Sequence, residues 1–202
     1  MSSAAESGVQ TALVEALVRN RAKVSELEDE YTKKIADITV PYKQALEALL
    51  VKRQPTLDAQ PGFWAKAIAS PSAPTRALLD ETADLRILRA VKSFRVATSY
   101  QEGTDHSKLV RRITFTLNSN IFIENAELFR EIDGDGATLA IGAVKWKVPE
   151  RARQNSIFGK LFDAATGADT IKEAVDAFDE VFQNPQLFID DDEAPRSGGP
   201  QQ

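Results

Sequence analysis

Residues 9–51 carry a long helical repeat of apolar side chains, and this repeat limits the possible folds more than any other feature of the sequence. Its members are spaced three, four or seven residues apart: Leu13, Leu17, Val24, Leu27, Tyr31, Ile35, Ile38, Tyr42, Leu46 and Leu49. This spacing places them on one face of an α-helix. Glycine is absent from Val9 to Pro61. At 1.5 Å per residue, roughly 45 helical residues extend about 65 Å, too long for a helix folded into a small globule.

Such a helix must bury its apolar face against another helix, and no second helix of matching length is predicted in this chain. The simplest solution is a homodimer of paired long helices, with those ten apolar residues as its interface. Asn20 falls on the seam, and the steps from Leu27 to Tyr31 to Ile35 depart from a strict heptad, which relaxes any supercoil locally. At Pro41 we expect a kink and not an end, because the apolar spacing continues to Leu49.

A second region begins after Pro55 and the segment 56–62, which are expected to end the long helix. Phe63 and Trp64 open a predicted short helix that stops at Ser70 and Pro71, and residues 72–88 are expected to hold one or two helical turns. The aromatic pair Phe63 and Trp64 is interpreted as core and not as a binding site.

Between Leu88 and Trp146 the apolar period changes towards two, which predicts β-strands. Four antiparallel strands are expected, in two hairpins: 88–98 with 109–117, and 127–132 with 138–146. A polar loop at 101–107 closes the first hairpin, and the glycine-rich turn at 133–136 closes the second. The two aspartates of that turn do not make a calcium loop, because the other alternating oxygen ligands and the distal glutamate are missing.

After Pro149 the period becomes helical again. Residues 157–162 form a short apolar face that ends by Gly167, and Asp169 or Thr170 is expected to cap a last helix, with Glu173 completing a capping box if Thr170 is the cap. One face of that helix carries Ile171, Val175, Phe178 and Phe182. The opposite face carries Glu173, Asp176 and Glu180, with Asp179 at its border.

Negative charge is concentrated near the C-terminal end. The chain has a formal net charge of −5, but ten acids lie between Asp163 and Glu193, where Lys172 is the only base, so this window alone carries −9. Such a local field can steer a cationic partner, although a solvated helix face followed by an acidic tail would give the same pattern. Strong direct binding to the phosphates of nucleic acid is disfavoured.

The sequence contains none of the residue patterns that support catalysis. It has no cysteine and a single histidine, His106, which lies in a polar loop and is interpreted as solvated. The P-loop, the nucleophile elbow, the His-Glu-x-x-His site and the dinucleotide fingerprint are absent. Glu124 with Glu127 could act as an acid/base pair only in a pocket that the pattern does not indicate. We expect no catalytic residue, metal site or cofactor. Without a leader pattern or a long apolar run, we also expect a soluble chain that is neither secreted nor membrane-bound.

Several motifs, taken in order, resemble those of one known family. The most specific is ITFTLNSNIFIENAELFREI at residues 113–132, with an Asn-x-Phe-x-x-Asn turn made by Asn120, Phe122 and Asn125. The others are VPY (40–42), FW (63–64), VKWK (144–147) and IFGKLF (157–162). Over residues 27–182 the chain resembles the nucleosome assembly protein family of histone chaperones, in its shorter SET-like branch.

The resemblance implies an α+β fold. A long N-terminal dimerisation helix (1–58), paired antiparallel in a homodimer, precedes an earmuff domain (59–189) in which helices pack on a four-stranded antiparallel sheet. A short acidic tail (190–202) follows. The concave underside of the two earmuff domains is expected to bind core histones. Carboxylates expected to face the histones are Glu124, Glu127, Glu173, Asp176, Asp179, Glu180, Asp190, Asp191, Asp192 and Glu193.

Two departures from the family pattern limit what carries over. Members commonly end in a long acidic tail, whereas only residues 190–193 are acidic here, and the family's basic nuclear-import cluster is not evident. The resemblance still implies a nuclear protein, with shuttling to the cytoplasm left open. Either of the two core histone pairs remains a candidate partner. The alternative function is that of a dimeric adaptor or inhibitor that regulates a histone-modifying enzyme or a phosphatase.

Overall fold

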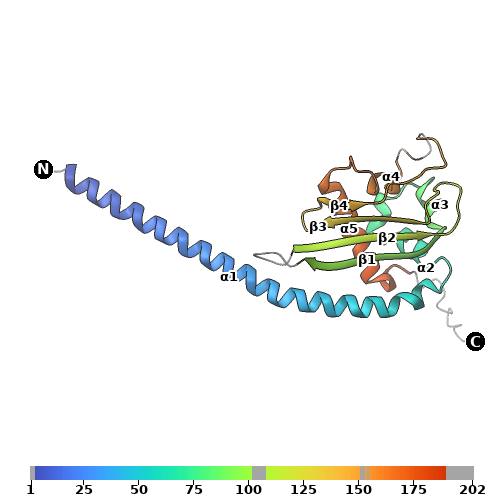
Figure 1. Cartoon of the computed structure of the whole chain (residues 1–202), viewed down its shortest axis with the longest axis horizontal. Coiled ribbons are helices and arrows are strands. Elements are labelled where there is room, and N and C mark those ends of the chain that lie inside the picture. The colour runs from blue at the N-terminus through green and yellow to red at the C-terminus, as the bar shows by residue number, and fades with distance from the viewer. Residues whose placement is uncertain (1–2, 102–107, 151–152, 154, 190–202) are drawn as a thin grey trace, which may run out of the picture.

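A single 56-residue helix, α1 (Ser3–Asp58), extends far beyond the rest of the chain, which folds around its C-terminal part (Figure 1). The computed structural model describes residues 3–101, 108–150, 153 and 155–189. Helix α1 passes through Pro41 without ending, as predicted, and Figure 1 shows it changing direction along its length. It also continues through Pro55 and ends at Asp58, within the segment 56–62 that was expected to end it.

The end of α1 at Asp58 has a clear physical reason. The carboxylate of Asp58 accepts hydrogen bonds from the indole Nε1 of Trp64 and the hydroxyl of Ser93, both at 2.7 Å. The Gln54 side chain also donates to Asp58, at 2.8 Å. These bonds join the last turn of α1 to the short helix and the sheet that follow it, and Leu57 packs against the core from the same turn.

Short helical elements connect α1 to the sheet. They are α2 (Phe63–Ala69), the 3-10 helix η1 (Pro74–Leu78) and α3 (Asp84–Leu88). The sheet consists of β1 (Val91–Gln101), β2 (Lys108–Leu117), β3 (Glu127–Asp133) and β4 (Thr138–Ile141). The strands are antiparallel in the order β1-β2-β3-β4. After them come α4 (Ile157–Leu161), α5 (Ala168–Gln183) and the 3-10 helix η3 (Pro185–Leu187). This order confirms the predicted fold class.

The fourth strand is shorter than predicted, because it ends at Ile141 and does not reach Trp146. The segment that follows pairs instead with the Asn-x-Phe-x-x-Asn turn. Glu124 N–H donates to the Lys145 carbonyl at 2.9 Å, and Lys147 N–H donates to the Phe122 carbonyl at 2.8 Å. An isolated bridge between Ile123 and Trp146 lies between these two bonds.

The two asparagines of this turn hold it in place. The Asn120 side-chain oxygen accepts from the backbone N–H groups of Phe122 and Ile123, at 2.9 and 2.8 Å. The Asn125 side-chain oxygen accepts from Lys145 N–H at 2.7 Å, and its amide donates to the Ala143 carbonyl at 3.1 Å. The motif is therefore a backbone-binding device that replaces the end of a regular strand.

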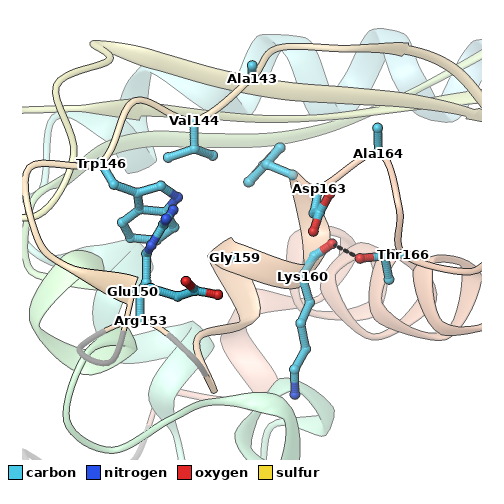
Figure 2. A pocket seen from close by; sticks show the side chains of 11 residues that line it. Ala143, Val144, Trp146, Glu150, Arg153, Gly159, Lys160, Asp163, Ala164 and Thr166 are labelled. Atoms are coloured by element: carbon cyan, nitrogen blue, oxygen red, sulfur yellow. Dashed lines mark hydrogen bonds between the residues drawn. The ribbon is translucent and has the colours of Figure 1, made fainter.

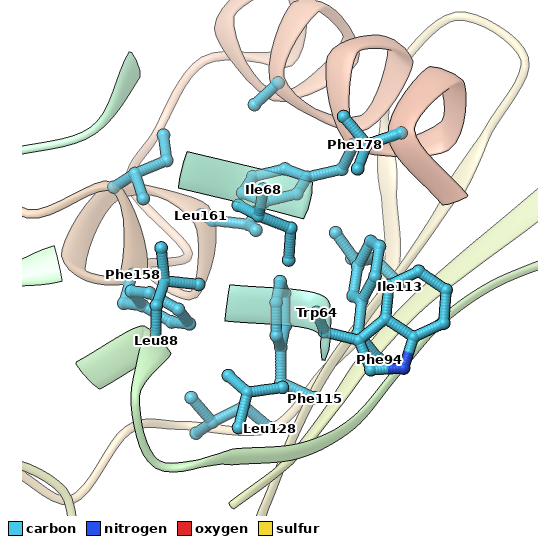
Figure 3. Close-up of a cluster of buried hydrophobic side chains, with 14 of the residues drawn as sticks. Trp64, Ile68, Leu88, Phe94, Ile113, Phe115, Leu128, Phe158, Leu161 and Phe178 are labelled. Carbon is cyan, nitrogen blue, oxygen red and sulfur yellow. The ribbon is translucent and has the colours of Figure 1, made fainter. Parts of the chain in front are cut away.

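Helices α2, α4 and α5 pack their aromatic side chains on one face of the sheet, as predicted from the apolar periods (Figure 3). Phe94 of β1 and Phe115 of β2 lie at the centre, with ring centroids 4.7 Å apart. The rings of Trp64, Phe158 and Phe178 close around them at 5.1–5.7 Å. Trp64 is only 2% exposed, which confirms it as a core residue.

Helix α1 covers the β1 edge of the sheet. The Glu47 carboxylate pairs with Arg95 and accepts from the Thr98 N–H at 3.3 Å. The Gln54 amide donates to the Phe94 carbonyl at 2.9 Å. These side chains satisfy backbone groups that an edge strand otherwise leaves open to pairing with another chain.

The predicted side-chain cap of the last helix is wrong, because α5 begins at Ala168 and its N-cap residue is Gly167. Thr170 lies inside the first turn.

The first turn of α5 packs closely on the β3–β4 turn: a Cβ built on Gly136 would lie 2.5 Å from the Ala168 carbonyl oxygen. The turn itself is as predicted, with Gly136 at φ +89°.

Replacing Gly136 by alanine is therefore expected to destabilise the fold by about 2–4 kcal/mol, because a left-handed conformation is combined with a backbone clash. The matched control is Gly134→Ala in the same turn, where the new Cβ would meet only the Leu109 Cβ at 3.8 Å. The control should stay within about 0.5 kcal/mol of the original chain. Denaturant unfolding of the three proteins measures both effects, and equal stabilities would contradict the packing described here.

Candidate functional site

The most conspicuous surface feature is a row of uncovered apolar side chains along α1. We call this the apolar stripe, and it consists of Leu13, Leu17, Val24, Leu27, Tyr31, Ile35, Ile38, Tyr42 and Leu49. These nine side chains are 47–71% exposed. Among the described residues, twelve of the fifteen exposed large hydrophobic side chains belong to α1. An apolar surface of this extent marks an interaction site.

Leu46 is the exception among the ten residues predicted for the helix interface. It is half-buried and packs against the core of its own chain. Leu50, next to Leu49 on the neighbouring side of the helix, is buried in the same core. In its C-terminal half α1 therefore has two apolar sides, one covered by its own chain and one uncovered.

The second candidate surface is the carboxylate face of α5, which the sequence analysis assigned to Glu173, Asp176, Asp179 and Glu180. Glu173 and Glu180 are exposed, and no ion pair involves them within the part of the chain that the structure describes. They are seven residues apart on one helix, so they lie on the same side of it, two turns apart. These two carboxylates are available to a partner.

Asp176 and Asp179 are engaged inside the chain instead. Asp176 pairs with Arg111 of β2 and with Lys172 at 2.8 Å. Partial burial alone would raise the pKa of Asp176, but the hydrogen bonds and charges of Lys172 and Arg111 outweigh it, and the pKa lies below its usual value. Burial raises the pKa of Asp179 above its usual value although Gln183 donates to it at 2.8 Å. Two of the four carboxylates assigned to this face are therefore already bound within the chain.

Among the remaining predicted carboxylates, Glu127 lies on the other side of the sheet from α5. Glu124 and Glu127 are exposed, but the Glu127 side chain is on the sheet face opposite α5, because Leu128 and Phe115 face the core. The cluster at 190–193 lies outside the described residues, as does His106. Within the described residues, the exposed acids of α5 are thus separate from those beside β3.

Three buried charged residues were not recognised from the sequence. Arg111 and Arg130 lie on the core face of the sheet, and Asp84 is completely buried. Arg130 donates to the Leu161 and Asp163 carbonyls, both at 2.9 Å, which ties β3 to the end of α4. The strand alternation could have indicated this burial, because both arginines stand at positions of the strands that otherwise hold core-facing apolar residues. A charged side chain buried at such a position needs a partner.

Asp84 joins the start of α3 to the start of α4. It accepts from the Ser156 hydroxyl and from Ile157 N–H at 2.8 Å, and also from Asp80 N–H at 2.7 Å. Burial raises the pKa of Asp84 above its usual value, against the effect of these three donors. Its partners are backbone groups and one hydroxyl, so Asp84 has a structural role.

A pocket of about 520 Å³ lies beside the segment that follows β4 (Figure 2). The Trp146 ring forms one wall, and the Arg153 guanidinium stacks on it at 5.1 Å from the ring centroid. Glu150 and Asp163 line the pocket, while the Lys160 side chain points away from it (Figure 2). Two carboxylates and one guanidinium thus line the pocket, and the guanidinium is stacked on Trp146.

No group of three or more His, Cys, Asp or Glu side chains among the described residues could hold a metal ion. In the same part of the chain, no helix is both long and apolar enough to cross a membrane.

Solved structures with the same fold include nucleosome assembly proteins. Nucleosome assembly protein S from Plasmodium falciparum is 17% identical with a TM-score of 0.62, over 87% of this chain and 99% of that one. Another P. falciparum nucleosome assembly protein is 15% identical with a TM-score of 0.62, over 90% and 94%. Nucleosome assembly protein 1 from Plasmodium knowlesi is 13% identical with a TM-score of 0.61, over 89% and 95%. No protein-family model and no curated protein matches the sequence. The chain therefore has the fold of nucleosome assembly proteins, including the long helix.

The Arg111–Asp176 pair gives a testable pH dependence. Asp176→Asn is expected to lower the free energy of unfolding at pH 7 by about 1–2 kcal/mol, because buried Arg111 loses its counterion while Asp176 itself is half-exposed. Because the pKa of Asp176 is lowered in the folded chain, this stabilisation exists above about pH 4 and is lost as the pH falls further. The difference between the two proteins should therefore shrink from pH 5 towards about pH 2.

The matched control is Glu173→Gln on the same helix, whose side chain is exposed and outside the described ion pairs. It should change stability by less than about 0.5 kcal/mol at either pH. Urea unfolding at several pH values measures both variants. A pH-independent loss in Asp176→Asn would contradict the assigned ion pair.

Proposed function

We propose that this chain is a histone chaperone of the nucleosome assembly protein family that acts in the nucleus as a homodimer. The observation that carries the proposal is the match of nearly the whole chain, long helix included, to solved nucleosome assembly proteins. The backbone-binding turn of Asn120 and Asn125, on which the sequence resemblance mainly rests, supports the same assignment.

The dimer follows from the apolar stripe. Covering half of each exposed stripe side chain contributes on the order of 1 kcal/mol per residue, and the described part of the chain offers no helix of similar length to do this. A second copy of α1 supplies the missing surface. The stripe continues to Leu13, far from the folded body, so the partner must itself be a long helix.

Core histones are the proposed partner because their surfaces are strongly cationic. Glu173 and Glu180 present unpaired carboxylates on one side of α5, and residues 190–193 add four acids shortly after the helix. Carboxylates in these positions compete with DNA phosphates for the same cationic side chains, so the protein can hold histones and release them without a chemical step. The proposed activity is binding and transfer, with no cofactor and no catalysis.

Reversing two charges tests the histone surface. Glu173→Lys combined with Glu180→Lys should weaken binding of core histones about tenfold or more, which corresponds to about 1.4 kcal/mol. The control reverses two exposed acids away from this surface, Glu26→Lys with Asp135→Lys, and should stay within about threefold of the original chain. Titration against each core histone pair, at near-physiological and raised salt and with DNA as competitor, measures the effect.

Unchanged affinity in the double variant would remove α5 from the interface. If the original chain and both variants all lose histone binding at modestly raised salt, the binding is non-specific charge attraction. That result would contradict the chaperone proposal. The alternative, regulation of a histone-modifying enzyme or a phosphatase, predicts instead that the double variant loses histones but still binds that enzyme.

A charge in the stripe tests the dimer. Leu27→Asp should convert a dimer of twice 22.2 kDa into a monomer, because an unpaired carboxylate would be buried against the partner helix. Lys33→Asp introduces the same side chain on the opposite side of α1 and should leave the dimer intact. Sedimentation of the three proteins gives their masses, and a Leu27→Asp variant that stays dimeric would refute the proposed interface.

A further inference from the structure

The two edges of the sheet differ in what covers them. Helix α1 covers the β1 edge, where Glu47 and Gln54 bind backbone groups of the strand. The other edge is formed by β4 and then by the segment 143–147, which pairs with the Asn-x-Phe-x-x-Asn turn. Leu139 of β4 is 48% exposed. An open edge of this kind can pair with a further strand.

The segment after β4 has backbone groups that point away from the sheet. The Lys145 N–H donates to the Asn125 side chain at 2.7 Å, and the Lys145 carbonyl accepts from Glu124 N–H at 2.9 Å, so both groups face the turn. Backbone groups of successive residues in an extended chain point to opposite sides, so those of Val144 and Trp146 point outward. Within the described residues they take part in no hydrogen bond. This edge therefore offers two donors and two acceptors to another extended chain.

The pocket of about 520 Å³ lies on one side of the same segment (Figure 2). Val144 and Trp146 line it and Lys145 does not, because side chains of an extended segment alternate between its two faces. Phe162, which is 4% exposed, and Ala164 add apolar surface to the wall. A residue paired directly opposite Val144 or Trp146 has its side chain on the same face. That side chain would therefore enter the pocket.

Two carboxylates line the pocket. Glu150 and Asp163 are exposed, and neither belongs to an ion pair within the part of the chain that the structure describes. Ala165 N–H donates to one oxygen of the Asp163 carboxylate at 3.0 Å, which orients this group. Both carboxylates can therefore accept hydrogen bonds from a cationic group in the pocket.

The cations nearest to the pocket have other contacts or directions. The Arg153 guanidinium stacks on the Trp146 ring, and the Lys160 side chain points away from the pocket (Figure 2). Arg130, which is 1% exposed, donates to the carbonyls of Leu161 and Asp163. The charges that face an incoming side chain are therefore mainly the two carboxylates.

We propose that this edge and its pocket bind an extended peptide segment of a partner protein by strand addition, with a lysine or arginine side chain of that peptide in the pocket. The methylene groups of the cation lie against Trp146 and Phe162, and its charged end meets Glu150 and Asp163. The neighbouring peptide residues face the side of Lys145, where acidic or neutral side chains fit. Because the site is defined by the shape and charge of the peptide, the inference does not depend on the histone proposal.

Short synthetic peptides test the charge preference. The probe is a fluorescent threonine peptide with one central lysine, and the comparison peptide has glutamate at that position. The lysine peptide should bind the full chain at least about tenfold more tightly, because the two carboxylates attract lysine and repel glutamate. Fluorescence anisotropy measures both affinities.

A double variant of the pocket locates this preference. Glu150→Gln with Asp163→Asn keeps the shapes of both side chains and should remove the preference for lysine. The matched control changes two exposed acids elsewhere, Glu26→Gln with Asp135→Asn, and should keep it. Thermal unfolding verifies that each variant is folded. Peptide binding should also change the fluorescence of Trp146, since Trp64, the second tryptophan of the chain, is buried in the core.

Backbone methylation of the peptide tests strand addition without changing the protein. Two versions of the lysine peptide carry N-methyl groups on alternate residues, one on the even and one on the odd positions. Only one of these sets of N–H groups can face the edge. One version should therefore lose about tenfold or more in affinity, and the other should keep its affinity.

Each result has a definite meaning. Absence of binding, tighter binding of the glutamate peptide, or an unchanged preference in the double variant of the pocket would overturn the assignment of a cationic side chain to this pocket. Two methylated peptides that behave alike would overturn strand addition. None of these measurements uses histones, so a failure here is distinct from a failure of the proposed function.

Discussion

Helix α1 presents two apolar sides, and the rest of the structure depends on how each is covered. One side, which includes Leu46, Leu50 and Leu57, is buried by the chain's own core and holds the helix to the β1 edge of the sheet. The other side is the apolar stripe, which remains uncovered along most of the helix. Burial of apolar surface is the main favourable term in folding and association. The first side therefore attaches the helix to the folded body, and the second side is available for association with a partner.

Buried polar groups fix the arrangement of the short elements around the sheet. Asp84 holds the start of α4, Arg130 holds its end, and Arg111 joins β2 to α5 through Asp176. Each of these groups would be costly to bury without its partners, so the helices cannot shift along the sheet without losing them. The aromatic core supplies most of the attraction, and these bonds determine where each helix lies.

The same bonds reduce the charge that α5 offers to a partner. Asp176 and Asp179 are bound within the chain, and of the four α5 carboxylates assigned to the acidic face only Glu173 and Glu180 stay outside the described ion pairs and side-chain hydrogen bonds. Under the proposed function, recognition of a cationic protein by α5 would depend on a few placed carboxylates more than on a uniformly acidic helix.

The sequence by itself determined those features that depend on period. The spacing from Leu13 to Leu49 predicted the long helix, and the alternation around Ile113 and Phe115 predicted the strands. The apolar face of α5 was also predicted correctly. In each case burial on one side of the element imposes a period on its residues. Only the tertiary structure decided the features that depend on contacts between distant segments. The end of β4 at Ile141 depends on Asn125 binding Lys145, and the start of α5 at Ala168 depends on Gly136 beneath it. The division of the α5 carboxylates into paired and free groups depends on Arg111, 65 residues away in sequence, because a charge is neutralised by whatever the fold brings beside it.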